Sequence, residues 1–177
     1  DQEYWMFQRG WKLDRCEMDG TVDLRSIKKE EILSSFSGKC RNMVRQAERH
    51  SVSASETQDF AAFWALLEAT LTARHSAKPT HTLTEIQNLV KIAPSHVRLF
   101  GAFLQQKMIA GTVVITLNDG ALYTLYMAQD YEKSDLHPMH CVLTHVMSVA
   151  IAEGRKVLHL GVSTEDGGRK VNEGLFF

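Results

Sequence analysis

The hydrophobic pattern of this chain changes its period near residue 97, and this change most constrains the possible folds. Before it, apolar residues recur at helical spacing over residues 60–71. After it, apolar and polar residues alternate in three runs, over residues 97–104, 108–117 and 121–128. Short polar links join the runs, and the second link contains the Asp119-Gly120 step that favours a tight turn. The three runs are therefore predicted to form an antiparallel meander.

Helical periods with recognisable end signals surround the meander. Helices are predicted over residues 37–50, 60–74, 82–93 and 138–153. Ser37 is a suitable N-cap, Thr82 and Glu85 have capping-box spacing, and Pro138 suits a first helical turn. Shorter apolar runs predict strands at residues 52–56 and 157–162, an opening strand or two before residue 24, and a last helix near residues 171–177. This order indicates a single α/β domain.

Composition excludes several classes of protein. With 44% apolar residues and 3 prolines in 177 residues, the chain can bury a core and is not disordered. The 20 Lys and Arg residues nearly balance the 21 Asp and Glu residues, so no overall field would hold DNA or an anionic membrane. The longest apolar stretches are far shorter than the roughly 20 residues that a membrane span needs.

The three cysteines, Cys16, Cys40 and Cys141, have unrelated spacings, which argues against a disulfide framework and against a cysteine-rich zinc site. A reducing cytoplasm is therefore the predicted location. The chain begins at Asp1 and stops at Phe177 inside an apolar run, as a fragment would. Residues 1–18 are interpreted as an N-terminal extension or the end of a preceding segment, and residues 19–177 as one domain.

Several side chains are candidates for chemistry, each with a plainer alternative. Arg41, Arg45 and Arg49 recur at every fourth position, so they form either a phosphate-binding stripe or a solvated helix face. His75 and His81 flank a loop between two helices, where either could be a base or simply a surface residue. They are six residues apart with no Cys or Glu at ligand spacing, so no metal site is expected.

Two further candidates lie in or after the strands. Tyr123 and Tyr126 are predicted to lie on opposite faces of one strand, so at most one of them can face a cleft, and Tyr126 is the candidate. Glu165 follows the strand at residues 157–162 and could act as a base or remain a solvated loop acid.

The order of elements resembles that of the GNAT acyltransferases, and four local sequences strengthen the resemblance. Residues 106–113 resemble the turn from the second to the third strand of that superfamily, and residues 41–47, 152–164 and 171–177 look like the branch that includes the Fem-type peptidoglycan-bridge aminoacyltransferases. The resemblance covers roughly residues 20–177. It implies a GNAT-type mixed, mainly antiparallel sheet flanked by helices, with the last strand missing from the chain. An open sheet edge beside residues 157–162 would follow, and a homodimer could form through it.

The resemblance also implies which residues bind the acyl donor and the acceptor. Strand residues Leu125, Tyr126 and Met127 would offer backbone donors to the donor molecule. The donor's phosphates would meet the next helix start, formed by His137, Pro138, Met139 and His140, and Asn172 would also bind the donor. Glu165, Tyr126 and His81 would be catalytic, and Arg41, Arg45, Arg74 and His75 would bind the acceptor or phosphate.

One loop departs from the usual family pattern. Residues 129–138 contain no Gly and three carboxylates, whereas glycines usually let the main chain wrap a pyrophosphate. The Fem-type branch tolerates this departure. The Tyr that protonates the leaving group in many members would lie beyond Phe177.

The resemblance therefore predicts an N-acyltransferase without a metal. Its donor would be acyl-CoA, with acetyl-CoA favoured, or aminoacyl-tRNA. Its acceptor would be an amine or hydroxyl on a small molecule or a cell-envelope precursor. The alternative is a catalytically silent GNAT-like binding module that forms half of a two-domain protein and binds an acceptor or tRNA.

Overall fold

The computed structural model describes residues 2–172. The helices are α1 (Gln2–Gln8), α2 (Ile32–Ser35), α3 (Gly38–Arg49), α4 (Phe60–His75), α5 (Leu83–Ile92) and α6 (Pro138–Ala152), with short 3-10 helices η1 (Lys29–Glu31), η2 (Tyr131–Leu136) and η3 (Asp166–Gly168). The strands are β1 (Asp19–Asp23), β2 (Ser53–Thr57), β3 (Val97–Leu104), β4 (Lys107–Asn118), β5 (Ala121–Gln129), β6 (Val157–Val162), β7 (Thr164–Glu165) and β8 (Lys170–Val171).

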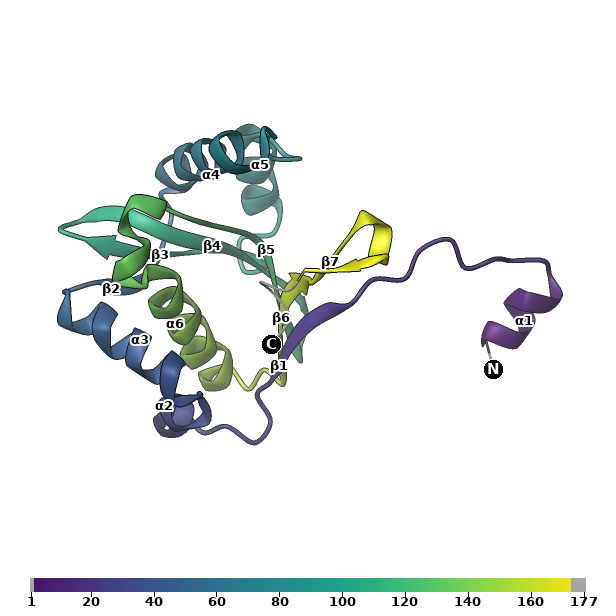
Figure 1. Cartoon of the computed structure of the whole chain (residues 1–177), viewed down its shortest axis with the longest axis horizontal. Coiled ribbons are helices and arrows are strands. Elements are labelled where there is room, and N and C mark those ends of the chain that lie inside the picture. Colours follow the sequence, from purple (N-terminus) through teal and green to yellow (C-terminus); the bar gives the residue numbers. More distant parts are fainter. Residues whose placement is uncertain (1, 173–177) are drawn as a thin grey trace. The chain divides into compact units, whose positions relative to one another are not determined.

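Six of the strands form one sheet in the order β1-β6-β5-β4-β3-β2 (Figure 1). The pairs β2–β3, β3–β4 and β4–β5 are antiparallel. The pair β5–β6 is parallel, and α6 connects these two strands. The sheet is therefore mixed and mainly antiparallel, as the sequence predicts.

The chain divides into a larger unit, residues 22–159, and a smaller unit made of residues 1–21 and 160–177. In the larger unit, α4 and α5 pack against one face of the sheet, where α4 contacts β4 and β5 (Figure 1). Helix α6 packs against the other face and is covered in turn by α3. Strands with helices on both faces need apolar side chains on both faces, and β4 is accordingly buried from Met108 to Val114.

Buried side chains fill the layers on both faces of the sheet in the larger unit. Between α4, α5 and the sheet, the fully buried members include Phe63, Leu67, Ile86, Leu99 and Val113. On α6, Val142 and Val146 are fully buried as well. Each large apolar side chain that leaves water contributes about 1.5–3 kcal/mol to folding.

The end signals read from the sequence are confirmed. The Ser37 side chain accepts a hydrogen bond from the N–H of Cys40 at 3.3 Å and begins α3. The capping box of Thr82 and Glu85 is complete at the start of α5. Pro138 is the first residue of α6, and Gly154 follows the helix with a φ of 72°. These signals are local, so the sequence alone defines them.

The predictions for the two ends of the chain are confirmed only in part. Residues before 24 contain one strand, β1, but also the helix α1, which the sequence pattern did not predict. Val171 lies in β8 and not in a helix, and the rest of the predicted last helix, residues 173–177, is outside the described part.

The prediction of an open edge beside β6 is wrong, because β1 is the neighbour of β6 in the sheet. The N–H of Ser163 donates to the carbonyl of Met18 at 2.7 Å, and the N–H of Leu24 donates to the carbonyl of Lys156 at 2.8 Å. A strand from early in the chain thus occupies this edge, which removes the basis for a homodimer formed through it.

Among the described residues, the helices are too short or too polar to span a membrane.

Candidate active site

Strand β5 contains a bulge and has a partly unpaired edge. Tyr126 lies opposite Val113 of β4. Thr124 lies opposite Val114, so Leu125 is an extra residue in β5. On the other side, β5 pairs with β6 only through its first three residues. Within residues 2–172, the remainder of β5 therefore has one main-chain edge without a strand partner.

The bulge also decides which face of the sheet the two tyrosines occupy. Tyr123 lies opposite Ile115, and Tyr126 lies opposite Val113. Because Ile115 and Val113 are two residues apart in β4, they share a face, and so do their partners. The prediction that Tyr123 and Tyr126 lie on opposite faces is wrong, since the extra residue Leu125 shifts the alternation by one.

Tyr126 and His81, both predicted as catalytic, contact each other. The Tyr126 hydroxyl oxygen is 2.7 Å from Nδ1 of His81 and also accepts a hydrogen bond from the main-chain N–H of His81 at 3.2 Å. Both residues are partly buried, so the pair borders solvent without being fully exposed. The hydroxyl is thus held by two contacts from one residue of the α4–α5 loop.

The ring of Tyr126 is fixed by packing as well as by hydrogen bonds. Trp64 of α4 meets it edge to face, with ring centroids 5.4 Å apart. Leu125 and Tyr126 both pack against the buried cluster that contains Trp64 and Val113. A bulge turns two consecutive side chains toward the same side, which explains how both can reach this cluster. Tyr126 therefore has its aromatic body in the core and its hydroxyl at the surface.

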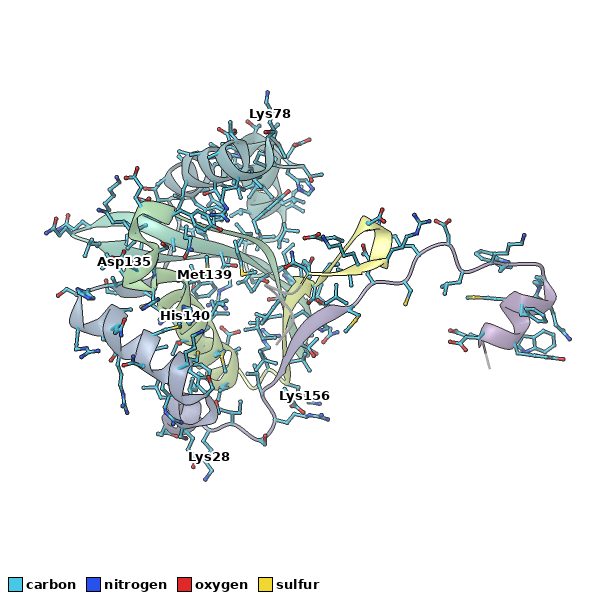
Figure 2. All side chains as sticks on the ribbon, viewed as in Figure 1. Lys28, Lys78, Asp135, Met139, His140 and Lys156 are labelled. Carbon is cyan, nitrogen blue, oxygen red and sulfur yellow. The ribbon has the colours of Figure 1, made fainter. Side chains whose placement is uncertain are left out.

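The start of α6 carries the residues predicted to meet the donor's phosphates (Figure 2). His137 precedes the helix in a left-handed conformation, with φ 53°, and its Nε2 lies 2.9 Å from Oε1 of Gln46. Within the described residues, the side chain of the N-cap residue His137 makes no capping hydrogen bond to the first N–H groups of α6. Burial, with a smaller contribution from the nearby His137 ring, lowers the pKa of His140. Met139 lies between these two histidines in sequence.

Helix α4 ends beside the loop between β5 and α6. The Arg74 guanidinium carbon lies over the Tyr131 ring, 4.0 Å from its centroid. One turn earlier, the Thr70 hydroxyl donates to the carbonyl of Gln129 at 3.2 Å. Arg74, a predicted acceptor or phosphate ligand, is therefore stacked on the loop that precedes α6. His75 is the last residue of α4.

The predicted basic stripe on α3 divides into two kinds of arginine. Arg41 donates to the carbonyl oxygens of Phe36 at 2.9 Å and of Ser34 at 3.3 Å, so it holds the turn before the helix. Arg45 and Arg49 are exposed and line an open surface pocket with Asn42 and Glu48. The guanidinium groups of Arg45 and Arg49 can therefore bind a ligand, whereas the guanidinium group of Arg41 is hydrogen-bonded to main-chain carbonyls.

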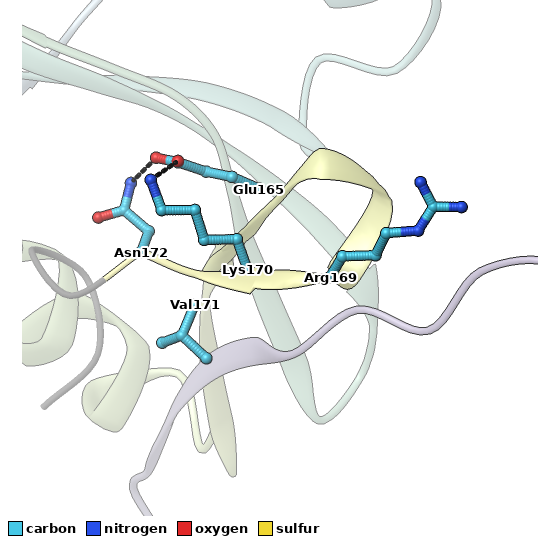
Figure 3. A pocket seen from close by; sticks show the side chains of 5 residues that line it. All are labelled: Glu165, Arg169, Lys170, Val171 and Asn172. Carbon is cyan, nitrogen blue, oxygen red and sulfur yellow. Dashed lines mark hydrogen bonds and ion pairs between the residues drawn. The ribbon is translucent and has the colours of Figure 1, made fainter.

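Glu165 and Asn172 lie in the smaller unit and contact each other there (Figure 3). Nδ2 of Asn172 donates to Oε1 of Glu165 at 2.8 Å, and Nζ of Lys170 is 3.7 Å from Oε2. These three residues line a pocket with Arg169 and Val171. The carboxylate of Glu165 is exposed and faces an amide and an ammonium group.

The comparison with known protein families decides which family the chain represents. The model of the Acetyltransferase (GNAT) domain matches residues 34–166 of the 177 residues. The chain belongs to the GNAT acetyltransferase family. This result confirms the predicted family, the predicted fold class and the expected class of acyltransferase domain. A comparison with curated protein sequences found no match.

Solved structures with the same fold are distant in sequence from this GNAT domain. The crystal structure of FemX aligns with a TM-score of 0.73 and 15% identity, covering 94% of this chain and 58% of that one. The structure of L-PGS from Bacillus licheniformis aligns with a TM-score of 0.64 and 13% identity, covering 98% of this chain and 54% of that one. The GNAT chain thus spans just over half the length of these two proteins.

Three residues that contact members of the candidate site were not predicted as functional. Gln46 holds His137, Tyr131 lies beneath Arg74, and Glu85 anchors the turn that carries His81. Only Glu85 had a visible signal, its capping-box spacing, because the other two contacts join elements distant in sequence.

Among residues 2–172, no group of three or more His, Cys, Asp and Glu side chains is placed to hold a metal ion.

Proposed function

We propose that the chain transfers an acyl group from a thioester or ester donor to an amine or hydroxyl acceptor. The observation that carries this proposal is the unpaired edge of β5 beyond Thr124, on a strand that contacts α6 and holds the Tyr126–His81 pair. A carbonyl beside such an edge can receive hydrogen bonds from main-chain N–H groups as its oxygen gains charge. The uncapped start of α6 would meet the donor's phosphates at Pro138, Met139 and His140.

Tyr126 and His81 are proposed to remove the acceptor's proton. A main-chain N–H can only donate, so the N–H of His81 uses one lone pair of the Tyr126 oxygen. With the imidazole proton on Nε2, the phenol hydrogen is donated to Nδ1, and one lone pair remains for the acceptor amine. As the amine attacks the carbonyl, a C–N bond forms and the carbonyl π pair moves to oxygen, while the amine N–H bond breaks, an O–H bond forms at Tyr126 and the original phenol proton moves to Nδ1. When this adduct collapses, the C–S or C–O bond to the donor breaks, and the departing thiolate or alkoxide carries away the proton that the Tyr126–His81 pair took up.

The remaining predicted residues are proposed to bind rather than to react. A guanidinium group is not a general base, but those of Arg45 and Arg74 can neutralise phosphates of a donor or of an envelope precursor. Leu125 and Met127 would contribute main-chain groups, and Asn172 with Glu165 would form a polar surface in the smaller unit. We also propose that residues 1–18 are an N-terminal extension or the end of a preceding segment and that residues 19–177 form one domain.

A thermal-shift comparison tests the function and identifies the donor. The 177-residue chain is heated with acetyl-CoA, with longer acyl-CoAs and with aminoacyl-tRNA, since a ligand of the native state raises the Tm by mass action. A donor that raises the Tm is then assayed for transfer to amines. Binding without any transfer would favour the second candidate function, a silent GNAT-like binding module. No stabilisation by any of the donors would contradict the proposed donor site.

One observation weighs against an ordinary acyl-CoA donor. The loop from Asp130 to His137 forms the 3-10 helix η2 and carries Glu132 and Asp135 in front of α6. Asp130 uses its carboxylate to accept the N–H of Glu132 at 3.0 Å, so it caps η2. Carboxylates beside a pyrophosphate repel it, which is expected to weaken acyl-CoA binding.

A further inference from the structure

The guanidinium group of Arg74 lies over the ring of Tyr131. Its central carbon is 4.0 Å from the centroid of the ring. The π electrons of the ring attract the cation, so this contact uses none of the five N–H donors of the guanidinium group. Among residues 2–172, the guanidinium group of Arg74 takes part in no hydrogen bond or ion pair. Within this part of the chain, its donors are therefore available to a ligand.

The loop that carries Tyr131 also carries three carboxylates. They are those of Asp130, Glu132 and Asp135, in or beside η2. Within the described residues, none of these carboxylates forms an ion pair with Arg74. A carboxylate partner would neutralise the guanidinium and occupy its donors, whereas a ring beneath it leaves its charge and its planar fork unchanged. Stacking on Tyr131 thus keeps Arg74 able to bind an anion beside an acidic loop.

Hydrogen bonds fix the backbone on which this stack is built. The hydroxyl of Thr70 in α4 donates to the carbonyl of Gln129, the last residue of β5, at 3.2 Å. The N–H of Asp130 donates to the carbonyl of Ile109 in β4 at 2.8 Å. Tyr131 follows directly, so its ring projects from a loop start that is bound to the sheet. A side chain that is already ordered loses less conformational entropy when it binds a ligand.

We infer that Tyr131 is a positioning residue whose ring fixes the plane of the Arg74 guanidinium, so that Arg74 binds an oxyanion of a substrate. Phosphate and carboxylate groups both fit, because each accepts two parallel N–H···O hydrogen bonds from a guanidinium group. The inference rests on the proposed function for the claim that the oxyanion belongs to a substrate. Anion binding by Arg74 can be measured without any acyl transfer.

The position of Arg74 along α4 determines how far this oxyanion lies from the chemistry. Trp64 of the same helix contacts Tyr126, with ring centroids 5.4 Å apart. Arg74 is ten positions after Trp64, which corresponds to about 15 Å of helix. The oxyanion is thus remote from the Tyr126 hydroxyl, where the acceptor amine is proposed to react. A contact so far from the reacting atoms is expected to act on KM and not on kcat.

Four variants separate a positioning role from a surface contact. Tyr131→Phe keeps an aromatic face beneath Arg74 and removes only the hydroxyl, whereas Tyr131→Ala removes the face. Arg74→Lys keeps the positive charge and removes the planar fork. Lys78→Ala is the matched control, because it removes one exposed positive charge from the loop that follows α4 (Figure 2).

The decisive measurement is an NMR titration of the 177-residue chain with sodium pyrophosphate and, separately, with glutarate. At least one of these anions is expected to shift the Nε–H signal of Arg74 in the wild type. In Tyr131→Ala the Kd for that anion should rise about two- to fivefold, the size of an exposed cation–π contact. Tyr131→Phe and Lys78→Ala should bind it nearly as the wild type does, and Arg74→Lys should bind it more weakly. An unchanged Kd in Tyr131→Ala, or no shift of the Arg74 signal with either anion, would overturn the inference.

Kinetics with the donor that stabilises the chain identify the substrate that carries the oxyanion. Tyr131→Ala is expected to raise one KM about two- to fivefold and to leave kcat nearly unchanged. A higher KM for the donor assigns the oxyanion to the donor, and a higher KM for the acceptor assigns it to the acceptor. If neither KM changes in an active protein, Arg74 binds no substrate and the inference fails. If the wild-type chain transfers no acyl group, the proposed function fails, while the anion titration still decides whether Tyr131 positions Arg74.

Discussion

The ring of Phe63 lies so close to Gly111 that a Cβ atom on Gly111 would stand 2.8 Å from Cδ2 of the ring. The same Cβ would stand 3.0 Å from the carbonyl oxygen of Phe100. Phe63 is fully buried in α4, so its ring has no free space to move into. The missing side chain at Gly111 therefore lets α4 approach the sheet and places Trp64 against Tyr126.

Gly111→Ala is accordingly expected to destabilise the protein. Overpacking of a filled core costs about 1–3 kcal/mol of the free energy of unfolding. Gly38→Ala is the control, because a Cβ there would meet only the end of Arg41, at 3.9 Å, in a helix that favours Ala. Chemical denaturation of both variants checks the expectation. Equal stability of the two would show that α4 can move away from β4 without cost.

Tyr126→Phe tests the proposed base. The variant keeps the ring against Trp64 and removes the hydroxyl that faces His81, so kcat is expected to fall about 100-fold with KM nearly unchanged. Tyr123→Phe, on the same face of β5, is the matched control and should retain activity. Steady-state kinetics on both proteins give the comparison. Full activity of Tyr126→Phe would remove this hydroxyl from the mechanism.

Arg45→Glu tests the basic pocket on α3. Because Arg45 is exposed and guanidinium cannot act as a base, its reversal should raise KM for a phosphate-bearing donor about three- to tenfold and leave kcat nearly unchanged. Lys91→Glu, exposed on α5, reverses a charge on the opposite side of the sheet and serves as control. Affinity that does not change across a salt series would instead support a solvated helix face.

Local signals explain which parts of the fold and site could be predicted. The Thr82–Glu85 capping box, Pro138 at the start of α6 and the alternation along β3 to β5 each depend on residues within a few positions of one another. Such patterns fix element types and ends without tertiary information. The mixed, mainly antiparallel character of the sheet was predicted from the resemblance to GNAT proteins.

The features that the sequence did not reveal depend on contacts between distant residues. The bulge at Leu125 is set by the pairing of β5 with β4, and no single-strand pattern shows it. His81 and Tyr126 were both predicted as candidates, but their contact joins residues 45 positions apart. The pairing of β1 with β6 likewise joins segments far apart in the sequence, so local patterns alone predict an open sheet edge beside β6.

The stability of the folded chain is expected to depend on pH through His140 and His145 on α6. Burial lowers the pKa of His140, with His137 adding to the effect. Burial also lowers the pKa of His145, where Lys29 and Arg98 act in the same direction and Glu56 opposes them. Both rings are thus held neutral in the folded state at pH values where the unfolded chain already binds the proton.

The sign of the effect follows from proton linkage. Below the ordinary histidine pKa of about 6.5, the unfolded state holds more protons than the folded state, so the free energy of unfolding decreases as the pH falls. Above that pH both states are neutral at these positions, and the contribution is constant. Urea denaturation between pH 8 and pH 5 should therefore show a loss of stability that begins near pH 6.5. His145→Gln should reduce the slope of this loss while differing from the wild type by a constant amount at pH 8. A variant with the same slope as the wild type would show that His145 is protonated equally in both states, and that its surroundings between α6 and the sheet do not penalise the charged ring.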